Sequence, residues 1–331
     1  MNRILKSAYR LLRSYAMHLP EPLVRGIERI MEYQLKKAYR IACNVQSSPP
    51  VVISMFDGKI NPGGLSDRIL GVLSVYDACK AAGVKYKIFH TSPFELSDFL
   101  VPNKYDWKIG ETDIRLDASS KVLFIRSMIP YKNKCRQNRL IRIVRKLKTG
   151  QLHVYSNLDS FTPGTFGGLF NELFAPSDIL KQHIQTHSNN IGANYISITF
   201  RFQQLLGDFK EGNFKILGEE QKNKLLTECL ATVENIKSNN PNFNILVTSD
   251  SLTFLNKVSI LPYVYVIPGT IVHMAYSSDA SKGAYLKSFV DLLMIANAKK
   301  IYSVKIGDMY DSGFPKIAAK IHDRPFELIL K

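Results

Sequence analysis

PVVISM, residues 50–55, followed closely by NPGGLSDR, residues 61–68, is the stretch of sequence that decides the fold. The first run is apolar and rich in β-branched residues, which is typical of a buried strand. The second places two glycines and two helix-capping residues after that strand, and helical spacing then continues from about Ser66 to Ala82. A buried strand, a glycine loop and a helix are the opening unit of a parallel α/β sheet.

The same alternation of strands and helices continues along the chain on either side of residues 156–190. Before this stretch we expect strands at Tyr86–Phe89, Lys121–Ile125 and Gln151–Tyr155, and a basic helix at Lys132–Lys148. After it we expect strands at Tyr195–Phe200, Phe243–Val247, Tyr263–Ile267 and Lys300–Val304, and helices at Gly218–Ser238, Lys282–Ala298 and Asp308–Ile321. Residues 156–190 lose periodicity and carry repeated Gly and Pro, so we expect a linker region there.

Two successive α/β units predict two Rossmann-like domains whose parallel sheets face an interdomain cleft. We place the first domain at residues 46–175 and the second at 176–331. Residues 1–45 precede them as two basic amphipathic helices broken near Pro20. In the second helix Ile27, Ile30, Met31 and Leu35 have the spacing of a buried face.

The charge balance points to an anionic partner. The chain carries 44 Lys and Arg against 28 Asp and Glu, a net charge of +16. Such an excess favours a membrane surface, a nucleic acid or a phosphorylated substrate. Four widely separated cysteines predict neither a zinc site nor a disulfide framework. Without a signal peptide or a long apolar run, we expect a cytoplasmic protein. Its basic N-terminal helices either contact the inner-membrane surface or pack on the globular body, and periodicity does not choose between the two.

Four segments place glycine, arginine or small hydroxyl residues beyond the carboxyl ends of predicted strands, where ligands of open α/β sheets bind. Arg201 ends an apolar strand, and its guanidinium suits a diphosphate; the alternative is a buried ion pair with Asp208. Asp67 is either a general base or a helix cap, and Asp57 is the second candidate for the base. The candidate substrate-binding residues are Gly63, Gly64, Arg68, Asp208, Thr248, Asp250, Ser251, Ser312, Gly313 and Phe314.

The order of these segments resembles the GT-B fucosyltransferases, the group that includes nodulation-type α-1,6-fucosyltransferases and protein O-fucosyltransferases, and is closest to bacterial surface-glycan members. The resemblance covers about residues 50–325 and rests on Gly-Gly-Leu-Ser-Asp-Arg, the strand-ending Arg201, Thr-Ser-Asp-Ser and Ser-Gly-Phe. It implies a GDP-fucose donor bound mainly by the second domain and an acceptor facing the first.

Site roles follow from the same resemblance. It implies that Arg201 grips the diphosphate and that Asp250 contacts the guanine or ribose. It further implies that residues 312–314 contact the phosphates and that Gly63 and Gly64 lie beneath the sugar. The chain departs from the family pattern at Thr199, where His is usual, which leaves the donor open. Asp67, where Asn is common, is a second departure.

No Asp-x-Asp pair occurs in the sequence, so we expect neither a metal ion nor another cofactor, with the leaving charge met by Arg201 and backbone N–H groups. The sequence thus predicts an inverting transfer of fucose to a glycan, lipid-linked or protein hydroxyl during surface-polysaccharide synthesis. A transferase using another nucleotide-sugar, and a basic nucleic-acid-binding protein, are the alternatives.

Overall fold

The computed structural model describes residues 20–37, 39, 48–117, 119–127, 130–208, 215–272, 274 and 280–331. The basic helix predicted before Pro20 lies outside these residues. The chain divides into two compact units, the first made of Met1–Leu96 with Pro102–Ala175 and the second of Ser97–Val101 with Pro176–Lys331. Within the described ranges no helix combines the length and apolar character needed to cross a membrane.

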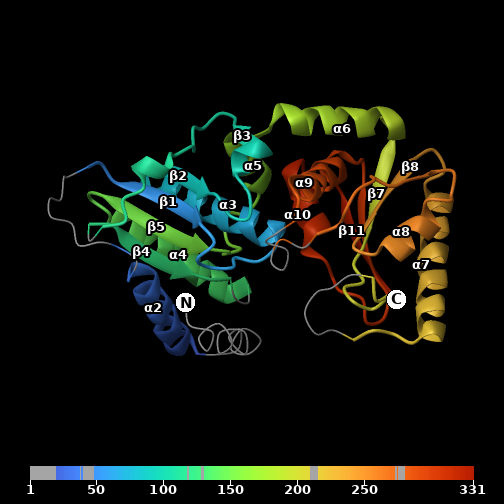
Figure 1. Ribbon diagram of the computed structural model, residues 1–331, viewed down its shortest axis with the longest axis horizontal. Coiled ribbons are helices and arrows are strands. Elements are labelled where there is room, and N and C mark those ends of the chain that lie inside the picture. The colour runs from blue at the N-terminus through green and yellow to red at the C-terminus, as the bar shows by residue number, and fades with distance from the viewer. Residues whose placement is uncertain are drawn as a thin grey trace. The chain divides into compact units, whose positions relative to one another are not determined.

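The first unit is built on a four-stranded parallel sheet in the order β2-β1-β5-β4 (Figure 1). Side chains of β1 alternate between two covered faces. Ile53 and Met55 pack with Met31 and Leu35 of the N-terminal helix, whereas Ser54 on the other face accepts a hydrogen bond from Tyr86. The strands of the unit are β1 (Val51–Phe56), β2 (Lys85–His90), β4 (Lys121–Ile125) and β5 (Gln151–Ser156). Its helices are α2 (Glu21–Lys36), α3 (Leu65–Ala82), α4 (Pro130–Arg145) and α5 (Phe166–Leu173), with a short 3₁₀ helix η2 (Glu111–Asp113).

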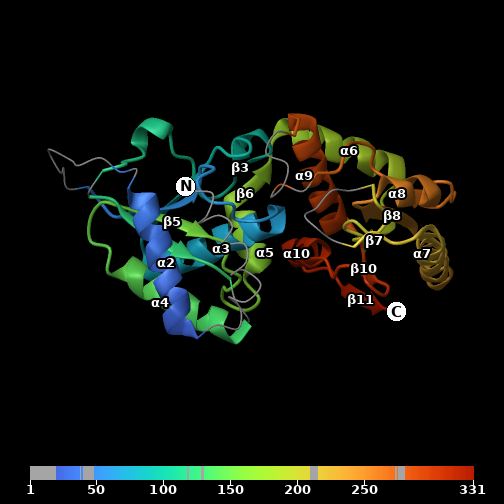
Figure 2. The same cartoon turned by 60° about the horizontal axis from the view of Figure 1, so that its bottom comes forward.

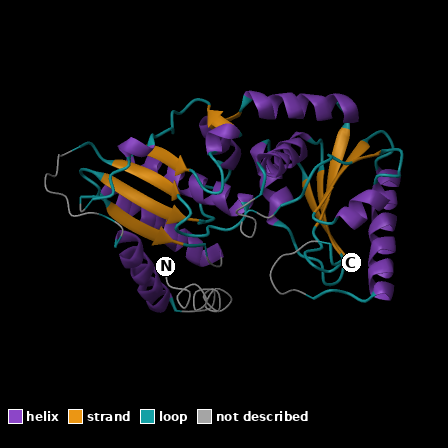
Figure 3. Cartoon of the chain, in the orientation of Figure 1, coloured by secondary structure: helices purple, strands orange, loops and turns teal. Residues whose placement is uncertain are grey.

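The second unit repeats this plan with a five-stranded parallel sheet in the order β11-β10-β7-β8-β9. Helices α7 and α8 cover one face of the sheet, and α9 and α10 cover the other (Figure 3). The strands are β7 (Tyr195–Phe200), β8 (Asn244–Ser249), β9 (Val264–Tyr265), β10 (Ile301–Lys305) and β11 (Phe326–Leu330). The helices are α6 (Asp178–Ile191), α7 (Glu219–Asn239), α8 (Leu252–Val258), α9 (Lys282–Asn297) and α10 (Gly313–Ile321), with a 3₁₀ helix η1 (Leu96–Asp98).

The linker predicted for residues 156–190 is wrong, because α5 and α6 occupy most of this stretch. Pro163 and Gly164 form a turn before α5, and Pro176 ends the short strand Phe174–Pro176. Gly167 and Gly168 lie in the first turn of α5, and Ser177, directly after Pro176, caps α6 by accepting a hydrogen bond from the Leu180 N–H. A two-stranded sheet of β3 (Leu100–Pro102) and β6 (Phe174–Pro176) was also not predicted.

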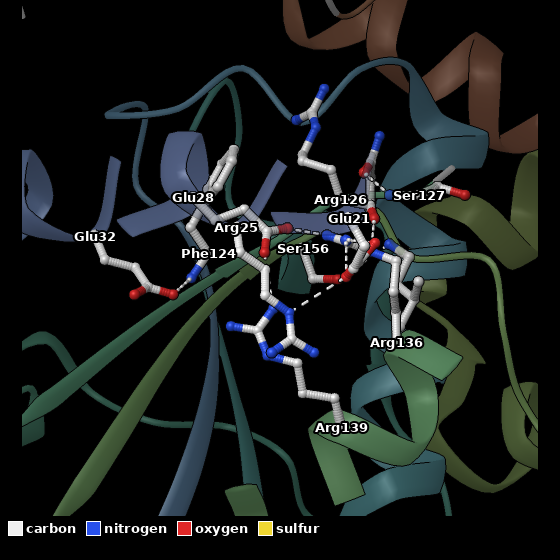
Figure 4. Close-up of polar contacts among 12 residues, drawn as sticks. Glu21, Arg25, Glu28, Glu32, Phe124, Arg126, Ser127, Arg136, Arg139 and Ser156 are labelled. Atoms are coloured by element: carbon white, nitrogen blue, oxygen red, sulfur yellow. Dashed lines mark hydrogen bonds and ion pairs between the residues drawn. The ribbon is translucent and has the colours of Figure 1, made fainter. Parts of the chain in front are cut away.

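Helix α2 is attached to the first unit by ion pairs as well as by apolar packing, and it contacts β4 (Figure 2). The Glu28 carboxylate is buried and bonds to Arg136 and Arg139 of α4, while Glu21 pairs with the same Arg136 (Figure 4). Burial lowers the pKa of the Arg136 guanidinium, and Glu21 opposes that shift.

These contacts correct two expectations about the helices. Ile30, expected on the buried face of the second helix, is exposed, and Glu28 is buried in its place. We expected the basic residues of the helix at Lys132–Lys148 on a solvated face, with Leu140 and Val144 inward; Leu140 and Val144 of α4 are buried, but Arg136 is buried as well. The pattern misplaces both charged residues because their burial depends on a partner helix distant in sequence.

We predict that Arg136→Met lowers the free energy of unfolding of the first unit by about 3–5 kcal/mol, because it leaves the Glu28 carboxylate buried without its principal partner. The only tryptophan, Trp107, is buried in this unit, so its fluorescence during urea denaturation follows the transition. Arg142→Met, an exposed position on the same helix, is the matched control and should change stability by less than about 0.5 kcal/mol. Equal effects of the two substitutions would contradict the prediction.

Candidate active site

A buried carboxylate organises the carboxyl edge of the sheet in the second unit. Asp250 follows β8 and accepts hydrogen bonds from the backbone N–H groups of Phe202 and Gln203, at 2.8 and 2.7 Å. Its Oδ2 also lies 3.2 Å from the Arg201 guanidinium. Burial raises the pKa of the Asp250 carboxyl, and Arg201 and the two N–H donors oppose that rise. The carboxylate therefore joins the ends of β7 and β8 and orients Arg201.

The Arg201 side chain is 16% exposed, so it is largely covered but still reaches solvent. Beyond it, Gln203 has a φ of +56°, a left-handed conformation that is unfavourable for a residue with a side chain. The hydrogen bond from the Gln203 N–H to Asp250 holds this turn in place. Asp250 thus positions the arginine instead of presenting free acceptors to a base or ribose, the role that the resemblance implied.

Asp208 is not the partner of Arg201, and the alternative of an Arg201–Asp208 pair is wrong. Its Oδ2 instead accepts hydrogen bonds from the Ser251 hydroxyl and the Thr253 N–H at the start of α8, at 2.8 and 2.7 Å. The Thr248 hydroxyl lies 2.8 Å from that of Thr199, and both residues are buried in neighbouring strands. The hydroxyls of Thr248 and Ser251 therefore form hydrogen bonds with other residues of the second unit.

The loop before α10 reaches the same edge, because the Tyr310 N–H donates to the Arg201 carbonyl oxygen at 3.0 Å. Ser312 caps α10 by accepting a hydrogen bond from the Phe314 N–H at 3.3 Å. Helix starts such as this one, at Gly313, are suited to anions because their first N–H groups lack helical partners. The structure therefore brings Arg201, Asp250 and the Ser312 segment together at one sheet edge.

The glycine loop lies in the first unit, between β1 and α3. Gly63 has a φ of +108°, and a Cβ there would approach Asp67 Oδ2 to 2.1 Å, so only glycine fits. Asp67 Oδ2 accepts a hydrogen bond from the Gly64 N–H at 3.0 Å, which makes Asp67 a cap of α3. The cap is the alternative that the sequence left open for Asp67, and its role as a base stays a prediction.

Arg68 is buried and points toward the end of β2. Its Nη1 donates to the Ser92 carbonyl oxygen at 3.0 Å and lies 3.4 Å from His90 Nε2. His90 stacks between the rings of Phe56 and Phe94, and its Nδ1 lies 2.9 Å from the Phe94 carbonyl oxygen. Burial and the nearby Arg68 lower the pKa of His90 to about 3, so the imidazole is neutral. His90 was missed because nothing in its local sequence marks it.

Asp57 follows β1 directly and lies at the carboxyl edge of the first sheet. It accepts hydrogen bonds from the Tyr155 hydroxyl at 2.9 Å and from the Lys59 ammonium at 2.8 Å. Burial and the Asp57 charge raise the pKa of Tyr155, which therefore remains a donor. The second candidate for the general base thus sits where ligands of parallel sheets bind.

Comparisons with known proteins identify solved structures that share the fold of this chain. No family model matches the chain, and no curated protein sequence does. A point mutant of Arabidopsis thaliana FUT1 in complex with GDP aligns with a TM-score of 0.52 and 11% identity, over 89% of this chain and 74% of that one. NodZ α-1,6-fucosyltransferase soaked with GDP-fucose aligns with a TM-score of 0.52 and 12% identity, over 83% of this chain and 92% of that one. NodZ from Bradyrhizobium aligns with a TM-score of 0.50 and 12% identity, over 82% of this chain and 93% of that one.

The chain has the fold of these fucosyltransferases. The predicted fold class, α/β and GT-B-like with two Rossmann-like units of parallel strands, is confirmed. Of the predicted site residues, Asp57, Gly63, Gly64, Asp67 and Arg68 belong to the first unit and the others to the second. Among the residues that the structure describes, no three His, Cys, Asp or Glu side chains group as metal ligands.

We predict that Asp250→Asn destabilises the second unit by about 2–4 kcal/mol. An amide can accept from only one side, so its NH₂ group would face one of the two backbone N–H donors, and Arg201 would lose its anionic partner. Thermal unfolding followed by calorimetry measures the change. Asp308→Asn is the matched control, because its ion pair with Lys215 is exposed and should contribute less than about 1 kcal/mol. A shift no larger than that of the control would contradict the role of Asp250.

We predict that the first unit loses stability as the pH falls from 6.5 toward about 4. Burial lowers the pKa of His90 to about 3 and that of His153 to about 4, so below 6.5 the unfolded chain takes up protons that the folded chain refuses. Each histidine should contribute about 1.4 kcal/mol per pH unit. Urea denaturation across this range measures the slope of the unfolding free energy against pH. His90→Gln should lower that slope by the amount that corresponds to about one proton. An unchanged slope would contradict a neutral buried His90.

Proposed function

We propose that this protein is an inverting glycosyltransferase that moves fucose from GDP-fucose to a hydroxyl acceptor. The observation that carries the proposal is Arg201, held by the buried Asp250 at the carboxyl edge of a sheet with the fucosyltransferase fold. One solved neighbour of this fold is in complex with GDP, and another was soaked with GDP-fucose. A fixed guanidinium at that edge fits the diphosphate of such a donor.

The proposed reaction breaks the bond between the sugar C1 and the phosphate oxygen and forms a bond between C1 and the acceptor oxygen. The bonding electrons leave with the GDP, whose charge Arg201 and the first N–H groups of α10 would stabilise. The acceptor gives its proton to a carboxylate, for which Asp67 and Asp57 are the candidates. Asp67 caps α3, and Asp57 at the strand end accepts hydrogen bonds from Tyr155 and Lys59, so both stay candidates for the base.

The reaction is proposed to need neither a metal ion nor another cofactor. Support comes from the sequence, which contains no Asp-x-Asp pair for binding a cation to the diphosphate. Arg201 would supply the positive charge in place of that cation.

The acceptor is proposed to be a glycan, a lipid-linked glycan or a protein hydroxyl in the synthesis of surface polysaccharides or glycoconjugates. The enzyme would act in the cytoplasm, at the membrane where such intermediates are assembled. The basic N-terminal segment, residues 1–45, supports this location.

One observation favours a second donor. Thr199 stands where the related family usually has His, and its hydroxyl is bonded to Thr248. A different nucleotide-sugar is therefore the alternative, and thermal shift against GDP and UDP separates the two. A nucleotide at a hundredfold excess over its Kd adds about 2.7 kcal/mol of stability. Nucleic-acid binding loses support, because Arg136 and Arg139 of the basic helix bind Glu28 within the unit.

We predict that Arg201→Ala lowers turnover with GDP-fucose by about two to three orders of magnitude, the loss typical of one stabilising group at a developing negative charge. Release of GDP in the presence of acceptor measures it. Arg324→Ala is the matched control, since Arg324 precedes β11 at the opposite, amino edge of the same sheet and should leave turnover unchanged. Turnover by Arg201→Ala at the level of the control would reject the proposal.

A further inference from the structure

Helix α2 separates its charges between two faces. All its acidic residues, Glu21, Glu28 and Glu32, face the body of the first unit, where they bond to arginines of α4 or to the edge strand β4 (Figure 4). Glu32 accepts a hydrogen bond from the Phe124 N–H at 3.0 Å. The outward face of α2 therefore carries mainly cations and apolar side chains, and Glu32 lies at its border with β4.

The apolar part of this face is a ridge of Leu23, Ile30 and Tyr33. Their exposed fractions are 57%, 52% and 64%, although each is a large side chain that would gain from burial. Intervals of seven and three residues set them on one side of a helix. Most of each side chain is open in the described part of the first unit, although the Lys37 ammonium lies over the Tyr33 ring, 5.0 Å from its centre.

A groove of about 420 Å³ lies beside the ridge, where α2 meets the start of β4. Arg29 and Lys36 of α2 and Lys121 of β4 line it, together with Tyr33, Glu32 and Val122. Burial raises the pKa of the Glu32 carboxyl, while the Phe124 N–H and the charges of Arg139 and Arg29 oppose that rise. The three cations make no ion pair with any residue that the structure describes, and an anion would satisfy them.

We infer that this outward face of α2 docks on an anionic phospholipid bilayer. The ridge of Leu23, Ile30 and Tyr33 enters the boundary between headgroups and acyl chains, and the groove of Arg29, Lys36 and Lys121 takes a lipid phosphate. The inference gives the membrane contact of the proposed function a surface and a lipid chemistry. Lipid binding and donor binding are nevertheless separate properties of the chain.

Charge and shape favour a bilayer over other partners. A second copy bound through the same face by twofold symmetry would bring a second set of these cations into the interface and no matching set of exposed carboxylates from α2. A nucleic acid would neutralise the cations but would leave the apolar ridge without a partner, whereas a bilayer offers phosphates and an apolar boundary side by side. The ion pairs of Glu28 keep α2 on the unit, so docking would need no unfolding.

Co-sedimentation of the full chain with vesicles tests the inference. Vesicles of equal parts phosphatidylcholine and phosphatidylglycerol should bind the protein, pure phosphatidylcholine vesicles should bind it far less, and added salt should weaken binding. Two triple variants, Leu23→Ser with Ile30→Ser and Tyr33→Ser, and Arg29→Glu with Lys36→Glu and Lys121→Glu, should each lower partitioning by at least about tenfold. Trp107 fluorescence verifies that both variants remain folded.

A matched control carries Ile260→Ser and Lys224→Glu, both at exposed positions of the second unit, and should bind vesicles like the parent. All variants should keep the thermal stabilisation by GDP, so failure of lipid binding is distinguishable from failure of the proposed function. Parental binding by both triple variants, as would occur if residues 1–19 alone held the vesicle, would overturn the inference. Equal binding to both vesicles, self-association through α2, or retention by single-stranded DNA without vesicle binding would overturn it too.

Discussion

A carboxylate removed from water must find hydrogen-bond donors elsewhere, and in the second unit Asp250 finds them on the neighbouring strand. Its two oxygens hold the turn after β7, including the unfavourable backbone of Gln203, and they orient the guanidinium of Arg201. The proposed donor site depends on this arrangement, because a flexible arginine would lose much of its electrostatic value in reorganising around the leaving group. The same carboxylate therefore serves the fold and the proposed chemistry.

The first unit uses buried carboxylates in a comparable way on its N-terminal helix. Glu28 and Glu32 bring α2 to α4 and to the edge strand β4, and the Glu32 bond satisfies an N–H group of that edge. Because the acids are used internally, the cations that remain on α2 face outward. The net charge of +16 is thus not spread evenly, and the attachment of one helix decides where part of it is displayed.

The likeness to solved fucosyltransferases at 11% and 12% identity shows how little residue identity this fold requires. Parallel sheets need buried strands, covering helices and turns of permitted geometry, and many sequences meet these needs. Because many sequences adopt this fold, the fold alone does not fix the function, which depends on particular side chains. Thr199, for example, is occupied by a hydrogen bond to Thr248 within the sheet.

The sequence by itself determined the α/β class, the position of most strands and the strand ends that carry Arg201 and Asp250. The strands Lys121–Ile125 and Tyr195–Phe200 were predicted with the observed bounds, because a short apolar, β-branched run indicates a buried strand without information from other elements. Gly63 was likewise predictable as a loop residue, although the lack of room for a Cβ there comes from the side chain of Asp67.

Only the tertiary structure decided which residues meet across long separations. Asp250, and not Asp208, pairs with Arg201, Glu28 is buried while Ile30 is exposed, and His90 is neutral beside Arg68. Periodicity describes the environment of a residue along its own element, whereas ion pairing and the burial of a charge depend on partners from other elements. Those partners are set by how the elements pack, which no local pattern contains.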